Sequence, residues 1–440
     1  MLSIFANKTF RSLFIAQLVA VLGTGLATVA LSLMAYDIAG AQAGSVLGTA
    51  LAIKMIASVS LAPVAAALAE RFSRKSILVG LDLIRAAVMV AFPFVTEVWQ
   101  IYCLIFLLQA ASAGFTPTMR ATIPDVLPDE RDYTRALSLT QLTYDLESVA
   151  SPVIAALLLT FFNFHELFAG TVLGFLASAA FIAVTILPSR RIITQDKIAK
   201  RTLTGMRIYI GTPRLRGLLA FSLVASCGSA MIIVNTVVLV QANMGLTQTA
   251  TALALATYGA GSMMAALCVP RLLEVIQDRA AMLIGASFIV VGMLAAGFIE
   301  SFAPILAVML ILGMGYGLIQ TPAGRLIRRS SGEADRATVF AAQFSFTHVC
   351  WLINYPLAGW LGAAIGLPST FWLLGGLASV ATVSALRLWP RKDPDVLSHL
   401  HDNLAPDHQH LHDGRTQGRA VRHAHAFVLD ELHERWPANR

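Results

Sequence analysis

Charged residues are scarce in this chain. Asp, Glu, Lys and Arg make up 13% of its 440 residues, against about 25% in an average soluble domain. Apolar residues reach 57%, and they are spread along the chain in stretches of about 20 residues, the length of helix that crosses about 30 Å of hydrocarbon. This composition excludes an ordinary soluble domain. It predicts a polytopic all-α membrane protein, because lipid offers no partner to free backbone groups outside a helix.

Other features that would indicate different classes of protein are also missing. The four cysteines lie within apolar stretches, so we expect no disulfide framework. The sequence contains no G-x-x-x-x-G-K-[ST] phosphate loop and no H-E-x-x-H zinc-protease motif, and we expect neither an enzyme nor a resident cofactor. The net charge of +7 comes from basic residues in short loops between spans, which argues against a nucleic-acid partner.

The apolar stretches predict twelve transmembrane helices. Six of the intervening loops contain no Lys or Arg, whereas the loops on the other side are basic. By the positive-inside rule, we expect a multi-pass protein of the cell inner membrane with both termini in the cytoplasm. The expected spans cover residues 11–34, 44–68, 77–97, 100–122, 136–161, 167–188, 216–240, 247–270, 281–300, 303–323, 337–363 and 369–388.

The two halves of the chain repeat each other at an offset of 205 residues. Gly23 matches Gly228, and Thr116-Pro117-x-x-Arg120 matches Thr321-Pro322-x-x-Arg325. Two six-helix pseudo-repeats imply a binding site near the bilayer midplane, between halves that rock against each other. The predicted parts are an N-terminal half (1–188), a cytoplasmic linker (189–215), a C-terminal half (216–388) and a cytoplasmic tail (389–440).

The loop between the second and third spans carries a family signature. It reads Ala-Ala-Leu-Ala-Glu-Arg-Phe-Ser-Arg-Lys over residues 66–75, which resembles the major facilitator pattern G-x-L-x-D-R-x-G-R-K with both glycines replaced. The following Asp82-x-x-Arg85 and the stretch from Phe115 to Pro128 resemble the macrolide- and siderophore-exporter branch. The resemblance implies the major facilitator fold, export, and a cytoplasmic gate; a merely solvated basic loop is the alternative. The gate residues would be Glu70, Arg71, Arg74, Lys75, Asp82 and Arg85.

Three charged residues lie near the expected midplane. Lys54 lies about ten residues into the second span, and Asp145 and Glu147 lie about ten residues into the fifth. A charge at this depth costs roughly 2.5–3.5 kcal/mol unless it is paired or solvated. We therefore predict that at least one acid binds a proton or a cation. The alternative is a structural ion pair between Lys54 and one of the acids.

The eleventh span, the repeat partner of the fifth, reads His348-x-Cys350-x-x-x-Asn354. We predict a role in transport or coupling for His348 and Asn354. Imidazole and thiolate together suit a transition metal, which makes Cys350 a candidate metal ligand. Two alternatives stay open: the cysteine acts as a small hydrophobe, and the histidine bonds a neighbouring helix.

The tail holds eight of the ten histidines, most of them in His-x-His pairs beside aspartates. A flexible segment of this kind can wrap imidazoles and carboxylates around a divalent ion; a polar, disordered tail is the alternative. Apolar residues between Phe427 and Trp436 suit a short helix that docks on the cytoplasmic face. The expected metal ligands are His399, His401, His408, His410, His412, His423 and His425.

A histidine-rich tail on a facilitator body resembles the nickel-resistance exporters of bacteria. The resemblance implies export of a divalent transition metal, nickel or cobalt, by proton antiport. The expected partners are a small cation or small-molecule substrate, protons and membrane lipid, and the expected state is a monomer. Two alternatives remain: efflux of a drug, macrolide or siderophore, and a membrane metal sensor that transports nothing.

Overall fold

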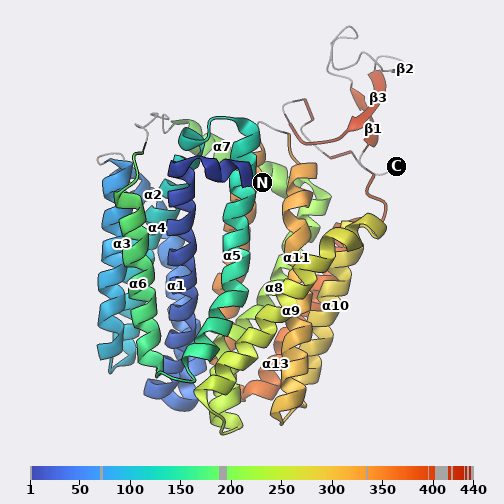
Figure 1. The fold of residues 1–440 in the computed structure, drawn as a ribbon. Coiled ribbons are helices and arrows are strands. Elements are labelled where there is room, and N and C mark those ends of the chain that lie inside the picture. Colours follow the sequence, from blue (N-terminus) through green and yellow to red (C-terminus); the bar gives the residue numbers. More distant parts are fainter. Residues whose placement is uncertain are drawn as a thin grey trace.

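The computed structural model describes residues 2–69, 73–187, 196–332, 335–394, 396–401, 415–417, 420–430, 432–433 and 436–437. Up to residue 388 these residues form a bundle of long helices, and the tail beyond it contains a small sheet (Figure 1). Both ends of the chain lie toward the same face of the bundle, called here the terminal face (Figure 1).

The N-terminal half contains six long helices. Polar N-caps start several of them: the Asn7 side chain accepts a hydrogen bond from the Phe10 amide, and Asp129 accepts one from the Asp132 amide. The helices are α1 (Lys8–Ala39), α2 (Ala43–Ala69), α3 (Arg74–Ala91), α4 (Val98–Val126), α5 (Glu130–Leu158) and α6 (Phe164–Ala183), with the 3-10 turns η1 (Leu2–Ala6), η2 (Gly40–Gln42) and η3 (Phe92–Phe94).

The C-terminal half repeats this plan. Its helices are α8 (Pro213–Val237), α9 (Gln248–Val275), α10 (Asp278–Ala296), α11 (Phe302–Arg329), α12 (Arg336–Ile365) and α13 (Leu367–Leu388), with the π-helical turn η4 (Val238–Asn243) after α8. One further helix, α7 (Asp196–Gly211), lies in the segment between the halves. In the described part of the chain, nine stretches are long and apolar enough to cross a membrane, and the first, Lys8–Ser58, runs through α1 into α2.

The contacts within each half are the same. In the N-terminal half, α1 packs on α5 and α6, α3 packs on α4 and α6, and α2 packs on α4. In the C-terminal half, α8 packs on α12 and α13, α10 packs on α11 and α13, and α9 packs on α11. These contacts correspond one to one under the internal repeat. The predicted fold of twelve helices in two pseudo-repeats is confirmed.

The halves meet through two pairs of helices, α2 with α12 and α5 with α9, which the repeat also interchanges. Glycines allow the first pair to touch: a Cβ atom on Gly48 would lie 2.5 Å from the Tyr355 carbonyl oxygen and 3.3 Å from the Gly359 Cα atom. In the second pair, Thr249 Oγ1 donates to the Leu159 carbonyl at 3.5 Å. These contacts join the start of α2 to the end of α12, and the end of α5 to the start of α9. The halves are therefore pressed together at the end of the bundle opposite the terminal face, where Figure 1 shows α9 approaching α5.

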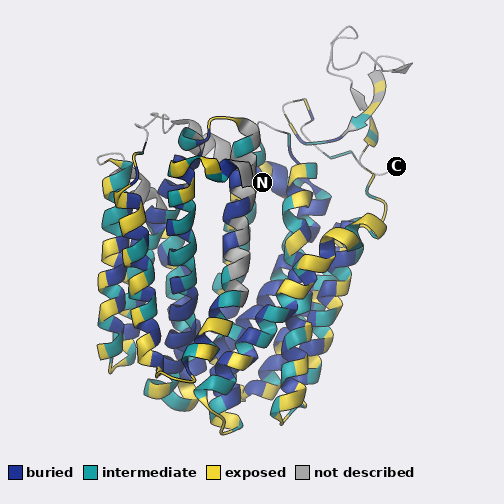
Figure 2. Ribbon diagram, in the orientation of Figure 1, coloured by how far each residue is buried: buried dark blue, intermediate teal, exposed yellow. Residues whose placement is uncertain are grey.

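The helix α7 lies on the terminal face and ties the linker to the C-terminal half. The Tyr209 hydroxyl donates to Gln343 Oε1 on α12, and Gln343 Nε2 donates to Ser222 Oγ on α8 at 3.3 Å. The outer surfaces of the bundle expose many apolar side chains, as expected where lipid replaces water, whereas α8 is largely buried (Figure 2).

The described part of the tail forms an antiparallel sheet in the order β1-β3-β2. The strands are β1 (Val396–His401), β2 (Arg415–Gln417) and β3 (Ala420–Ala426). The short helix expected after residue 426 is not formed at 427–430. Phe427 and Leu429 are buried while Val428 and Asp430 are not, and this alternation is the burial pattern of an extended segment.

The end of the tail nevertheless docks on the bundle, as expected. A Cβ atom on Gly211 would overlap the Leu429 side chain, and the Arg214 guanidinium lies 5.1 Å from the centre of the Trp436 ring. Arg214 is buried at the start of α8, where its Nε atom lies 3.7 Å from Asp393 Oδ1. The tail therefore rests where α7 meets α8.

Candidate transport site

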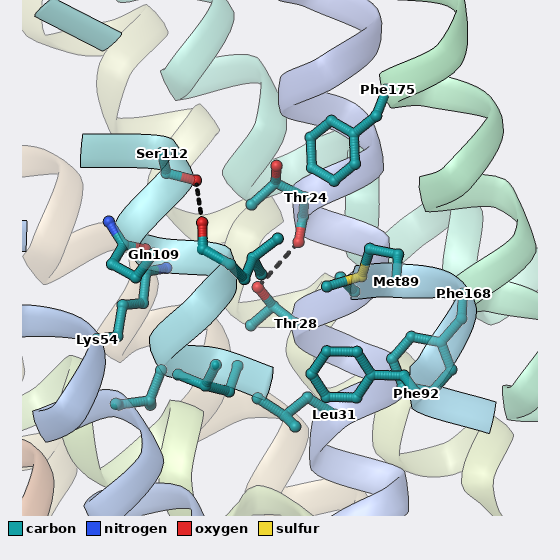
Figure 3. Close-up of a pocket in the computed structure, with 14 residues that line it drawn as sticks. Thr24, Thr28, Leu31, Lys54, Met89, Phe92, Gln109, Ser112, Phe168 and Phe175 are labelled. Atoms are coloured by element: carbon teal, nitrogen blue, oxygen red, sulfur yellow. Dashed lines mark hydrogen bonds between the residues drawn. The ribbon is translucent and has the colours of Figure 1, made fainter. Parts of the chain in front are cut away.

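A small cavity opens inside the N-terminal half beside Lys54. It has a volume of about 50 Å³, which is room for a few water molecules. Lys54 is the charged residue among its lining side chains (Figure 3). The other polar side chains that line it are Thr24, Thr28, Gln109 and Ser112, and aromatic walls come from Phe92, Phe168 and Phe175.

The hydrogen bonds around this cavity leave acceptors for a cation. Gln109 Nε2 donates to Ser58 Oγ at 2.6 Å, and Ser58 donates in turn to the Lys54 carbonyl at 2.8 Å. The hydroxyl of Thr28 donates to the Thr24 carbonyl at 3.1 Å, and that of Ser112 to the Leu108 carbonyl at 2.9 Å (Figure 3). Because the donors are used on neighbouring groups, the oxygen lone pairs remain to solvate an ammonium group.

The repeat explains why this cavity lies in the N-terminal half. Gly313 and Gly317 let α11 touch α9 through the backbone, since a Cβ atom on either glycine would overlap a carbonyl oxygen of α9. At the offset of 205 residues, the corresponding positions of α4 are Leu108 and Ser112. Both of these side chains line the cavity.

Glu147 lies on α5 within electrostatic range of Lys54. It is half-buried, and the two side chains interact electrostatically. Gly25 of α1 makes room for it, because a Cβ atom there would lie 3.0 Å from Glu147 Cγ and would overlap Ser151. Of the two acids predicted from sequence on α5, Glu147 is the one whose side chain the structure describes. The side chain of Asp145 lies outside the described residues.

His348 approaches the same place from α12. Its Nδ1 atom donates to the Phe344 carbonyl at 2.8 Å, so the Nε2 atom of the neutral ring is an acceptor. The ring also packs on Phe344, and it lies within electrostatic range of Lys54. Lys54, Glu147 and His348, all predicted from sequence, thus converge from three helices that line the interface between the halves.

Asn354 and Cys350 lie deeper in α12. Asn354 Nδ2 donates to Ser226 Oγ at 2.7 Å and to the Cys350 carbonyl at 3.1 Å, while Cys227 Sγ donates to Asn354 Oδ1 at 3.5 Å. Asn354 is fully buried and joins α12 to α8, so its coupling role stays a prediction. Cys350 is also buried. Among the described residues, no group of three His, Cys, Asp or Glu residues is placed to hold a metal.

The gate residues make two ion pairs. Arg74 pairs with Asp125 at the end of α4, and Asp82 pairs with Arg85 and accepts a hydrogen bond from Ser178 at 2.7 Å. The Arg85 guanidinium lies 3.8 Å from the centre of the Phe115 ring. These contacts tie α3 to α4 and α6. Lys75 is half-buried, and Glu70 and Arg71 lie outside the described residues.

In the tail, the structure brings His425 together with His433. Their Nε2 atoms lie 3.3 Å apart, and His433 Nδ1 donates to Asp430 Oδ1 at 2.8 Å. His399 stands opposite His423 in the register of β1 and β3. The side chains of His399, His401 and His423 lie outside the described residues, as do His408, His410 and His412 altogether.

The sequence patterns did not identify several residues that line the cavity beside Lys54. Thr24 with Thr28 and Gln109 with Ser112 recur at helical spacing in apolar spans, which is the signal that marks a polar face. The C-terminal half also gathers aromatic side chains. Tyr258 and Tyr316 have ring centres 6.2 Å apart, Trp351 lies 5.0 Å from Tyr355, and Ser229 hydrogen-bonds Tyr258.

Known proteins resemble this chain in sequence. It is 30% identical to macrolide efflux protein A of Streptococcus pyogenes over 131 residues, so the match spans about a third (32%) of that relative and 29% of the chain. An uncharacterized MFS-type transporter of Bacillus subtilis, YfiS, is 24% identical over 85% of the chain and 92% of its own length. The multidrug resistance protein MdtG of Enterobacter lignolyticus is 26% identical over 42% of the chain and 44% of its own length.

Solved structures share the fold at low sequence identity. A POT family transporter in complex with 5-aminolevulinic acid has a TM-score of 0.68 at 12% identity, covering 87% of this chain and 96% of its own. A D-xylose-proton symporter has a TM-score of 0.66 at 13% identity, covering 88% and 98%. The profile of the Major Facilitator Superfamily matches residues 13–232 and 218–406, and the chain therefore belongs to this superfamily of membrane transporters.

Proposed function

We propose that the protein exports its substrate from the cytoplasm in exchange for protons, and that Lys54, Glu147 and His348 form the coupling site. The observation that carries the proposal is the convergence of these three titratable side chains from α2, α5 and α12. Charged groups inside the membrane are retained at a cost, which makes them candidates for function. Relatives named for macrolide efflux and multidrug resistance support export.

The expected orientation fits this direction of transport. The basic loops lie on the side of both termini, which we take to be cytoplasmic. The halves touch at the opposite end of the bundle, through α2 with α12 and α5 with α9. Such a conformation offers the site to the cytoplasm, and rocking of the halves would then open it outward.

Coupling follows from competition for one carboxylate. While Glu147 is ionised, the Lys54 ammonium compensates its charge. When a proton or a cationic substrate reaches Glu147, the ammonium loses this partner and needs another source of solvation. The cavity beside it supplies acceptors from Gln109, Thr28 and Ser112. The site can thus carry a proton in one direction and a cation in the other without leaving a charge unsolvated in the membrane.

A divalent transition metal, nickel or cobalt, is the substrate that we propose. The His348 imidazole and the Glu147 carboxylate, each within electrostatic range of Lys54, are donor types that suit such ions. The tail supports the same choice. Two imidazole nitrogens bound to one tetrahedral ion lie roughly 3.3 Å apart, and the Nε2 atoms of His425 and His433 have this separation. Asp430 orients the His433 ring, as carboxylates do for metal-bound histidines.

The second candidate is efflux of an organic compound. The aromatic cluster of Tyr258, Tyr316, Trp351 and Tyr355 favours it, because aromatic faces bind apolar and cationic organic groups. The names of two relatives point the same way.

Growth of a strain lacking the gene separates the two candidates. The strain is complemented with the wild type, Glu147→Gln or Glu166→Gln and grown on nickel, cobalt, macrolides and siderophores. Glu166 is exposed in the first turn of α6 and serves as a matched control. We expect the wild type and Glu166→Gln to restore metal tolerance and Glu147→Gln to fail at equal protein levels. If the wild type restored tolerance to organic compounds and not to metals, the protein would export organic compounds, and metal export would be wrong.

A further inference from the structure

A second pocket lies on the terminal face of the C-terminal half, between the start of α10 and the segment after α13. It has a volume of about 530 Å³, and its lining is basic. The residues that line it are Gln277, Arg279, Ala280, Leu283, Arg391 and Lys392. Three cations around one hollow, with no carboxylate among the lining residues, form a site for an anion.

Arg279 is fixed at the wall of this pocket. Its Nε atom donates to the Trp389 carbonyl at 2.9 Å, and a terminal nitrogen donates to the Leu386 carbonyl at 3.3 Å. These bonds hold the guanidinium within electrostatic range of Arg391. The two like charges repel each other, and a shared anion would relieve the repulsion.

The internal repeat shows what the pocket lacks. Arg74, the counterpart of Arg279 in the N-terminal half, pairs with Asp125. The residue at the position of Asp125 in the C-terminal half is Ser330, at the same offset of 205 residues. The ion pair of the first half therefore has no equivalent carboxylate in the second.

Two described acids adjacent in sequence to lining residues of the pocket serve other partners. Asp278 is buried and lies 3.7 Å from Arg325, and Asp393 lies 3.4 Å from Arg329 and accepts a hydrogen bond from Trp389 Nε1 at 3.0 Å. These two acids of the described part of the chain are already paired, which leaves the pocket open to an anion from outside the chain.

We propose that this pocket binds the phosphate of an anionic phospholipid. Guanidinium groups match phosphate oxygens, and the headgroups of the cytoplasmic leaflet are anionic. Apolar contacts for the acyl chains lie next to the pocket, since Leu283 lines it and the side chains of Leu386 and Leu388 are exposed beside it. The proposal rests on the cytoplasmic orientation of the terminal face and is otherwise independent of the substrate.

The test compares lipid retention by the full-length protein in nanodiscs. Native mass spectrometry would count phosphatidylglycerol retained by the wild type, by Arg391→Gln/Lys392→Gln, and by the control Arg387→Gln, which removes an exposed charge from the end of α13 outside the pocket. We expect the double variant to retain phosphatidylglycerol roughly 25-fold less tightly, because each of the two basic residues removed strengthens anionic-lipid binding about fivefold. The control should behave like the wild type.

A second arm adds inorganic phosphate to the protein in phosphatidylcholine nanodiscs and follows its thermal stability. We expect no change in Tm, whereas phosphatidylglycerol should raise the Tm of the wild type and not that of the double variant. Equal stabilisation by inorganic phosphate would make the site one for a free anion and overturn the lipid proposal. Equal retention of phosphatidylglycerol by the double variant would overturn it as well. Neither readout depends on transport, so both are separate from the proposed function.

Discussion

The crossing of α2 and α12 predicts the effect of one added methyl group at Gly48. A Cβ atom there would lie 2.5 Å from the Tyr355 carbonyl oxygen, whereas ordinary contact begins at 3.4 Å. Gly48→Ala therefore requires the two helices to separate by the difference, 3.4 − 2.5 = 0.9 Å. Overpacking of this kind costs about 1–3 kcal/mol. This penalty destabilises the conformation in which the halves touch at the end of the bundle opposite the terminal face.

We expect the substitution to shift the population toward the outward-open conformation. A penalty of about 1–3 kcal/mol on one of two states changes their ratio by roughly 5- to 150-fold. The measurement is the distance distribution between spin labels at Gln42 and Ala364, two exposed positions at this end of α2 and α12. The labels are placed in a background without the four native cysteines. A longer component should appear, and transport should slow.

Gly376→Ala is the matched control. Its Cβ atom would meet nothing within 4 Å, and it lies within α13 away from the interface between the halves. The control should leave the distance distribution unchanged. If Gly48→Ala also left the distance distribution unchanged, with normal transport, the contact between the halves would not set the conformational equilibrium.

Three further predictions concern the cavity beside Lys54, the histidine-rich tail and the orientation in the membrane. Gln109→Leu removes an acceptor for the displaced Lys54 ammonium and should slow proton-coupled export in vesicles. Leu107→Ala, on the exposed face of α4, should leave the export rate unchanged. Equal export rates for the two variants would show that the cavity plays no part in transport. Truncation after Pro394 should weaken nickel export at low cytosolic nickel and matter little at high nickel. In calorimetry, the segment 395–440 should bind nickel at neutral pH and more weakly at pH 5, where imidazoles protonate. If the segment bound no nickel, the tail would not capture the ion for export. A cysteine at Ser301 should react with an impermeant thiol reagent from outside and one at Gly332 should not; the reverse pattern would overturn the orientation.

The parts of the fold that the sequence predicts are those that lipid enforces. Twelve apolar stretches and a constant offset between the halves suffice for the helix count and the pseudo-repeat, since backbone groups in lipid leave few alternatives to a helix. Lys54, Glu147 and His348 are found for a related reason: a titratable group in an apolar span is costly and conspicuous.

What the sequence does not predict depends on packing between distant segments. The cavity beside Lys54 arises because Leu108 and Ser112 stand where α11 has glycines, and no single position reveals that. The helix α7 lies in a stretch polar enough to pass for a linker, and its order comes from contacts such as Tyr209 with Gln343. The sheet in the tail pairs residues far apart in sequence, which histidine spacing does not indicate.

Proton movement driven by nickel in proteoliposomes shows directly whether the site formed by Lys54, Glu147 and His348 couples nickel to protons. Purified protein is reconstituted with a pH-sensitive dye inside, and nickel is added to the side of the terminal face. We expect a proton flux opposite to nickel movement for the wild type and for Glu166→Gln, and none for Glu147→Gln. Nickel transport by Glu147→Gln with an undiminished proton flux, or nickel transport by the wild type with no proton flux, would contradict coupling through the site formed by Lys54, Glu147 and His348.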